Sequence, residues 1–244
     1  MKLTYLTTTI IALGLITGCS QAQTTANNVD DVAAVTVQKT SQAAENGVNK
    51  VRALSKDGVK GKPSRPGVDV STAPAGVYKS EATHAYITFQ YLHQGYARPT
   101  LRWNEFDAVV DLNPTDPMNS SLNVTIDASS IDSGVEKFDE HLVGADFFDV
   151  ANHPSITFKS TEMDQLRVGH GRVTGDLTMK GITKPVKLDV TLNKVGENFR
   201  SKKPMMGISA KTRIKRSEWG LGKYTPLVGN DVDIKIEIEF IKEE

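Results

Sequence analysis

The stretch Val232–Phe240, VDIKIEIEF, alternates apolar and charged residues without a break. Side chains of an extended strand point to its two faces in turn, so this pattern predicts one apolar face against a core and one polar face in water. The same period recurs earlier, at 87–91, 106–112, 122–128, 156–158, 173–179, 186–192 and 208–214. With a short strand at 77–79, the pattern predicts eight or nine strands.

Short connections between these segments indicate an antiparallel meander. A sheet with one apolar face must pack on another sheet or close on itself. Closure of eight strands removes the exposed edges and encloses an interior wide enough for side chains or one small ligand. We therefore expect an all-β protein, a closed antiparallel β-barrel of about eight strands. Residues 131–152 break the alternation and follow helical spacing, which predicts one or two short helices near one end of the barrel.

The N-terminus has the features of an export signal. Lys2 precedes an apolar run at residues 10–15, which is far shorter than the roughly twenty residues of a membrane-spanning helix. Residues 16–19, Ile-Thr-Gly-Cys, resemble a bacterial lipobox, in which the chain is cut before an acylated cysteine. We expect a signal peptide at 1–18 and lipidation, for example with palmitate, at Cys19. No other cysteine exists, so an intramolecular disulfide is excluded.

The lipobox also predicts a location. Two or more acyl chains give a stable membrane anchor, so we expect a lipid-anchored protein of the bacterial cell envelope that faces the periplasm. Ser20 follows the cysteine in place of the aspartate that resembles an inner-membrane retention signal, which favours the outer membrane over the inner one. Residues 19–75 contain no aromatic residue and predict a lipidated N-terminus with a flexible linker, and residues 76–244 predict one barrel domain.

The charge pattern gives no support for nucleic-acid binding. The chain has 29 Lys and Arg residues and 29 Asp and Glu residues, so its formal net charge is zero. One local group of basic side chains is interpreted as the solvated face of a strand: Lys211, Arg213, Lys215 and Arg216.

A series of short motifs resembles the YceI-like family of lipid- and polyisoprenoid-binding proteins. The motifs are DEHL at 139–142, DFFDV at 146–150, PSITFKS at 154–160, GDLT at 175–178 and GITKPV at 181–186. The resemblance implies a lipocalin-like barrel with an elongated pocket for a polyisoprenoid, an isoprenoid quinone or a fatty-acyl chain. Leu101 and Ala108 stand where the family usually has glycine, and Trp103 where it has phenylalanine, so the resemblance does not identify the ligand.

Alternation alone does not distinguish a hollow barrel from a filled one. If the barrel is hollow, we expect its ligand-binding wall to include apolar residues from most strands, namely Phe89, Tyr91, Phe106, Val124, Ile126, Phe158, Leu177, Ala210 and Ile236. The chain would then bind and sequester or carry a long apolar molecule. The alternatives are an envelope-stress or surface structural module with a filled barrel and, third, a hydrolase or isomerase that acts on a lipid.

The polar residues offer little chemistry. The five histidines show no metal-ligand spacing, and no G-x-S-x-G nucleophile motif is present. We therefore expect no catalytic residue, no metal, no cofactor and no enzyme activity. Gly175 is expected to serve close packing. The expected partners are an apolar lipid or isoprenoid ligand and a membrane, without nucleic acid, and a homodimer stays open beside a monomer.

Overall fold

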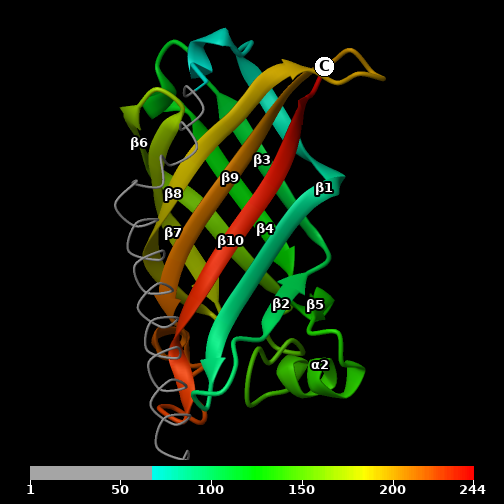
Figure 1. The fold of residues 1–244 in the computed structure, drawn as a ribbon, viewed down its shortest axis with the longest axis vertical. Coiled ribbons are helices and arrows are strands. Elements are labelled where there is room, and N and C mark those ends of the chain that lie inside the picture. The colour runs from blue at the N-terminus through cyan, green and yellow to red at the C-terminus, as the bar shows by residue number, and fades with distance from the viewer. Residues whose placement is uncertain (1–67) are drawn as a thin grey trace, which may run out of the picture. The chain divides into compact units, whose positions relative to one another are not determined.

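The computed structural model describes residues 68–244, which form a closed antiparallel β-barrel (Figure 1). The signal peptide predicted at 1–18, Cys19 and most of the linker predicted at 19–75 lie outside these residues. Eight strands make the barrel and confirm the predicted fold class: β1 (Gly76–His93), β3 (Phe106–Leu112), β4 (Ser121–Asp127), β6 (Ser155–Arg167), β7 (His170–Met179), β8 (Ile182–Glu197), β9 (Pro204–Lys215) and β10 (Val228–Lys242).

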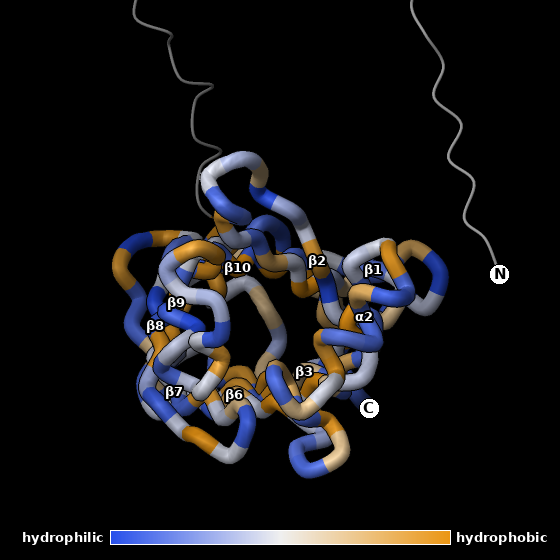
Figure 2. Tube along the Cα trace, turned by 90° about the horizontal axis from the view of Figure 1, so that it is seen from below, coloured by the Kyte–Doolittle hydropathy of each residue, from blue (hydrophilic) through white to orange (hydrophobic). Residues whose placement is uncertain are grey.

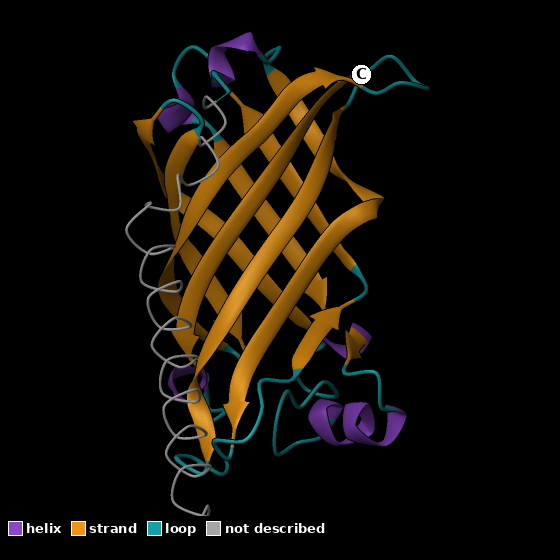
Figure 3. Cartoon of the chain, viewed as in Figure 1, coloured by secondary structure: helices purple, strands orange, loops and turns teal. Residues whose placement is uncertain are grey.

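Strand β1 closes the barrel because it pairs with β10 along its length. The sequence pattern predicted two strands here, at 77–79 and 87–91, but the structure has one long strand. A register shift between Ser80 and Ala85 separates the two halves, which explains why the alternation is interrupted. The first half pairs with β3 and the second half with the short strand β2 (Thr100–Trp103). Figure 3 shows the barrel strands, which are tilted relative to the long axis of the barrel.

One end of the barrel carries the only α-helix of the described residues, α2 (Glu136–Val143) (Figure 1). A helix was predicted within 131–152, and its place near one end is confirmed. The first two residues of that range instead form strand β5 (Ile131–Asp132), which pairs with β2. Neither β2 nor β5, of four and two residues, was predicted, and β5 lies in the range predicted as helical. No helix in the described part of the chain is long and apolar enough to cross a membrane.

Four short 3₁₀ helices complete the described elements: η1 (Val70–Thr72), η2 (Pro117–Asn119), η3 (Ala128–Ser130) and η4 (Arg216–Trp219). Helix η1 lies in the range predicted as linker. Its N-cap Asp69 accepts a hydrogen bond from the Ser71 backbone, and the following Ala73 is buried. The part of the chain from η1 onward therefore packs against the barrel.

The core lies inside the barrel and forms two apolar clusters. One surrounds Trp103, Leu142 and Trp219 near α2, and the other surrounds Tyr78 and Phe240 toward the C-terminal end of β10. Figure 2 looks along the barrel and shows the strands as a closed ring in which hydrophobic and hydrophilic residues alternate. The two-residue period therefore sorts side chains between the interior and the solvent.

Candidate ligand cavity

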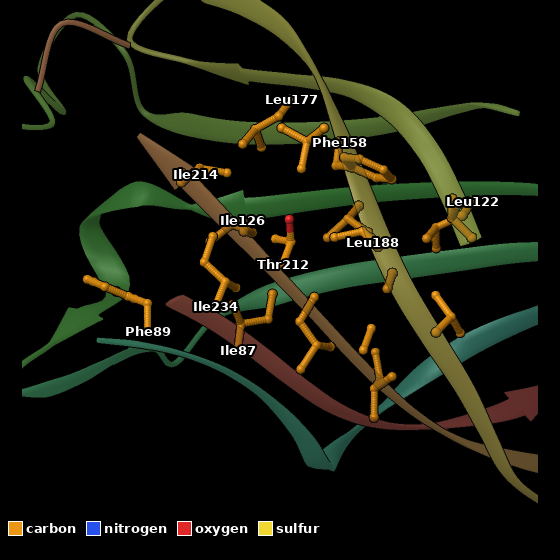
Figure 4. A pocket seen from close by; sticks show the side chains of 18 of the residues that line it. Ile87, Phe89, Leu122, Ile126, Phe158, Leu177, Leu188, Thr212, Ile214 and Ile234 are labelled. Carbon is orange, nitrogen blue, oxygen red and sulfur yellow. The ribbon is translucent and has the colours of Figure 1, made fainter. Parts of the chain in front are cut away.

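The barrel encloses a cavity of about 450 Å³. All eight barrel strands, β2 and α2 contribute side chains to its wall, which is mostly apolar. Figure 4 shows several of these side chains converging on the cavity, among them Ile87, Leu122 and Leu188. Small-molecule sites in proteins typically measure about 300–1,000 Å³ and are lined mainly by apolar groups. The interior is therefore hollow, with the size and lining of a ligand site.

The nine wall residues predicted from the sequence all line this cavity: Phe89, Tyr91, Phe106, Val124, Ile126, Phe158, Leu177, Ala210 and Ile236. They meet through strand pairing. Val124 on β4 lies opposite Phe158 on β6, which lies opposite Leu177 on β7. Ala210 on β9 lies opposite Ile236 on β10. That these residues contact a ligand stays a prediction.

Gly175 lies directly beside the Phe158 ring, which occupies the space that a side chain at position 175 would need. A β-carbon at this glycine would overlap the ring and would lie 2.5 Å from the Lys159 carbonyl oxygen. Real β-carbons do not approach backbone atoms so closely, so no larger residue fits without movement of the strand. The close-packing role predicted for Gly175 is confirmed, and the missing side chain leaves room for the ring.

Two aromatic residues near α2, Trp103 and Phe148, were not predicted as part of the wall, whereas their neighbour Phe89 was. Trp103 packs against Phe89 with ring centroids 4.6 Å apart and planes inclined by 30°, and it forms a T-shaped contact with Phe148 at 5.7 Å. All three rings line the cavity. The motif DFFDV carries Phe148, and the unpredicted strand β2 carries Trp103, so both segments help to close this end. The signal in the sequence that could have identified Trp103 and Phe148 is that both are large aromatic residues outside the strands predicted from the two-residue period.

Arg216 is buried, which corrects its interpretation as part of a solvated face. Lys211, Arg213 and Lys215 are exposed as predicted, but only 8% of Arg216 is exposed. The prediction placed all four residues on one face of a strand, but Arg216 has the opposite parity to the other three and therefore points to the other face. The even positions of β9 face inward, and Arg216 continues that series: Ile208, Ala210, Thr212 and Ile214.

Backbone carbonyl groups hold the Arg216 guanidinium at the edge of the cavity. Its Nε donates to the Gly229 oxygen at 2.8 Å, its Nη2 donates to the Val228 oxygen at 2.9 Å, and its Nη1 donates to the Leu221 oxygen. Burial lowers the pKa of this guanidinium from its ordinary value. The three acceptors are neutral, so they stabilise the guanidinium without neutralising its charge.

Polar groups line both ends of the cavity. Lys223 contributes at the end near α2 and forms an ion pair with the exposed Asp146, which lowers the pKa of that carboxyl group. The β6–β7 hairpin contributes Asp164 and His170 at the other end. Between the two ends the wall is almost wholly apolar, an arrangement that suits a molecule with a long apolar body.

One group of potential metal ligands lies outside the cavity wall. Glu81, His84 and Glu239 place one ligand atom each within 4.8 Å of one another, at the register shift of β1. His84 Nδ1 and Glu81 Oε2 lie 2.6 Å apart and are hydrogen-bonded, and His84 is exposed. This group does not adjoin the cavity, so it takes no part in the ligand site.

Comparison with known proteins agrees with the geometry. Residues 78–240 match the YceI-like domain. A UPF0312 protein of Pectobacterium atrosepticum is 33% identical over 179 residues, which cover 71% of this chain and 90% of that protein. The crystal structure of Burkholderia cenocepacia BcnA is similar with a TM-score of 0.60 and 26% identity, and the match covers 66% of this chain and 98% of BcnA.

A third similarity concerns the fold alone. A polyisoprenoid binding domain from Saccharophagus degradans has a TM-score of 0.51 and 12% identity, over 70% of this chain and 100% of that domain. The family match covers most of the described barrel, and the Pectobacterium relative is similar over nearly its full length. This chain therefore belongs to the YceI-like family.

Proposed function

We propose that this protein binds a long apolar molecule in the barrel cavity and sequesters or carries it in the cell envelope. The observation that carries the proposal is the cavity of about 450 Å³ with its apolar wall. Each CH₂ group that leaves water for such a wall contributes about 0.8 kcal/mol, so ten buried groups contribute roughly 8 kcal/mol before the entropic cost of binding is subtracted. Binding of this kind needs no catalytic group.

The proposed ligand classes are a polyisoprenoid, an isoprenoid quinone and a fatty-acyl lipid. All three have a long flexible apolar body, which would contact the apolar residues of the cavity wall, such as Phe89 and Leu188. The Saccharophagus degradans domain, described as polyisoprenoid binding, has the same fold and supports this choice. The alternative of a structural module with a filled barrel is disfavoured, because a filled barrel would not leave a cavity of this size.

Binding can be tested with purified protein and a fluorescent fatty-acyl probe. We expect saturable binding with one probe per chain, and displacement by unlabelled farnesol or hexadecanol. A short alcohol such as butanol serves as the control, and it should displace little because it buries few CH₂ groups. Failure of the probe to saturate, with no displacement by any long-chain competitor, would contradict the proposed function.

We further propose that the protein is held at the outer membrane by lipid attached to Cys19. The lipobox-like residues 16–19 and Ser20 support this location. Cells grown with labelled palmitate should label the wild-type protein and leave Cys19→Ala unlabelled, and the variant should leave the membrane fraction. Ser20→Ala serves as the matched control and should stay labelled. Equal labelling and equal membrane content of the wild-type and Cys19→Ala proteins would refute the anchor.

A further inference from the structure

Arg216 is a buried cation without an acidic partner among the described residues. It forms no ion pair there, and its hydrogen bonds all go to backbone carbonyl oxygens. A buried charge is costly unless an opposite charge or strong hydrogen bonds compensate it. The three carbonyl groups supply only part of that compensation, so an anion placed beside the guanidinium would be stabilised.

The guanidinium retains hydrogen-bonding capacity toward the cavity. An arginine side chain has five N–H donors, and three are used here, so one N–H remains on each Nη atom. Arg216 lines the cavity. The two terminal nitrogen atoms of a guanidinium can donate together to two oxygen atoms of a carboxylate or a phosphate, and a neutral headgroup does not form bonds of the same strength.

Tyr91 adds a second polar group at the same end of the cavity. Its strand partner Val232 lies opposite Ile214, two residues before Arg216. Tyr91 lines the cavity, and its hydroxyl has no hydrogen-bond partner among the described residues. Together they present free donors at one end of a chamber whose middle is almost wholly apolar.

The charges around the cavity favour an anion at this end. Asp164 is the one acidic residue that the described chain contributes to the wall, and it belongs to the β6–β7 hairpin at the far end. Near Arg216 the wall also includes Lys223. No carboxylate in the described wall therefore competes for the guanidinium.

We propose that Arg216 and Tyr91 form a headgroup site that selects an apolar chain ending in a carboxylate or a phosphate over the same chain with a neutral end. The inference rests on the proposed function, since the apolar body must occupy the cavity for its end to reach Arg216. The anionic oxygens would accept from the two free N–H groups of Arg216 and from the Tyr91 hydroxyl. The apolar wall supplies affinity, and this end supplies selectivity.

Two pairs of probes test the proposal and separate the two anions. Palmitate is compared with hexadecanol, and farnesyl phosphate with farnesol, at a pH where both acids are ionised. Hydrogen bonds to charged groups are stronger than those to neutral groups. In at least one of the two pairs, we therefore expect the acid to bind about tenfold or more tightly than the alcohol. A preference in the first pair alone assigns a carboxylate, and a preference in the second pair alone assigns a phosphate.

Variants connect the preference to the named residues. Arg216→Gln should bring the affinities for acid and alcohol to within about threefold of each other, and the ratio of the two affinities is the quantity compared with wild type. Tyr91→Phe keeps the ring and should reduce the preference in part, and it maintains the test if Arg216→Gln does not fold. Lys211→Gln removes an exposed charge from strand β9, which directly precedes Arg216, and should retain the full preference.

Equal affinity for acid and alcohol in the wild-type protein would overturn this inference while the proposed function stands, because both probes would still bind. A preference that persists unchanged in both Arg216→Gln and Tyr91→Phe would also overturn it. If none of the four probes binds, the proposed function fails and the headgroup site fails with it.

Discussion

Replacing Ala210 with leucine tests whether the cavity is real empty space. Ala210 lies on β9 between Val190 on β8 and Ile236 on β10, and its side chain points into the cavity. Leucine adds three carbon atoms at this point. In a hollow barrel they enter empty space, whereas in a filled barrel they must displace packed neighbours.

The expected magnitudes differ between these two situations. Burying three more carbons in an empty apolar space contributes up to roughly 2.4 kcal/mol, and the lost freedom of the leucine side chain offsets about 0.5–1 kcal/mol. Strain from fitting the larger side chain offsets a further part of the gain. We therefore expect the free energy of unfolding of ligand-free Ala210→Leu to stay within about 1 kcal/mol of wild type. Overpacking of a filled core would cost about 1–3 kcal/mol. The ligand should lose space for about three CH₂ groups, and its affinity should fall by up to roughly 60-fold.

Ala128 provides a matched control. It is 1% exposed, lies in η3 and does not line the cavity. Ala128→Leu should therefore lower stability by about 1–3 kcal/mol and leave probe affinity unchanged. Urea unfolding of the ligand-free proteins and probe titration measure both quantities. Destabilisation of Ala210→Leu equal to that of Ala128→Leu, or unchanged probe affinity in Ala210→Leu, would refute the reasoning.

Three further changes test the packing around the site. Gly175→Ala should lower the free energy of unfolding by at least about 1–3 kcal/mol in urea, because the new methyl group overlaps the Phe158 ring; stability equal to wild type would contradict the close approach. Val124→Asp buries a carboxyl group in the wall and should lower both the melting temperature and probe uptake, whereas full uptake would place this side chain outside the cavity. Tyr78→Phe removes a 2.7 Å hydrogen bond to the Pro74 oxygen and should cost about 1 kcal/mol at neutral pH. Burial raises the pKa of Tyr78, so its contribution to stability is present below the unfolded value of 10.0 and is lost as pH rises through the folded value. At alkaline pH the free energy of unfolding should therefore fall less steeply with pH in the variant than in wild type. Identical slopes in the two proteins would argue against this role.

The alternating sequence predicted the barrel because the two-residue period leads directly to side-chain direction. The pattern of Val232–Phe240 predicted a strand, and its inward residues line the cavity. Strand β1 was split in two because four residues at its register shift carry no period. Strand β5 was missed because its two residues lie in a range that was predicted as helical, and β2 because only two of its residues, Leu101 and Trp103, are apolar.

The cavity wall was predictable as a set of residues, but the hollow interior was not. The same inward side chains occur in a filled barrel, and the free volume depends on the number and tilt of all strands together. Arg216 shows a different failure. Its even number, which continues the inward series of β9, was visible in the sequence, but the charged neighbours Lys215 and Arg213 suggested a solvated surface. Parity, rather than residue type, places it correctly.

Native mass spectrometry of the full chain purified from bacterial membranes tests the central claim most directly. We expect a population with one added small molecule per chain, which organic extraction removes and identifies as a molecule with a long apolar body. Ala210→Leu should reduce that population, and Ala128→Leu should retain it in the folded fraction. A chain that carries no extractable molecule and takes up neither palmitate nor farnesol when they are added would contradict the account.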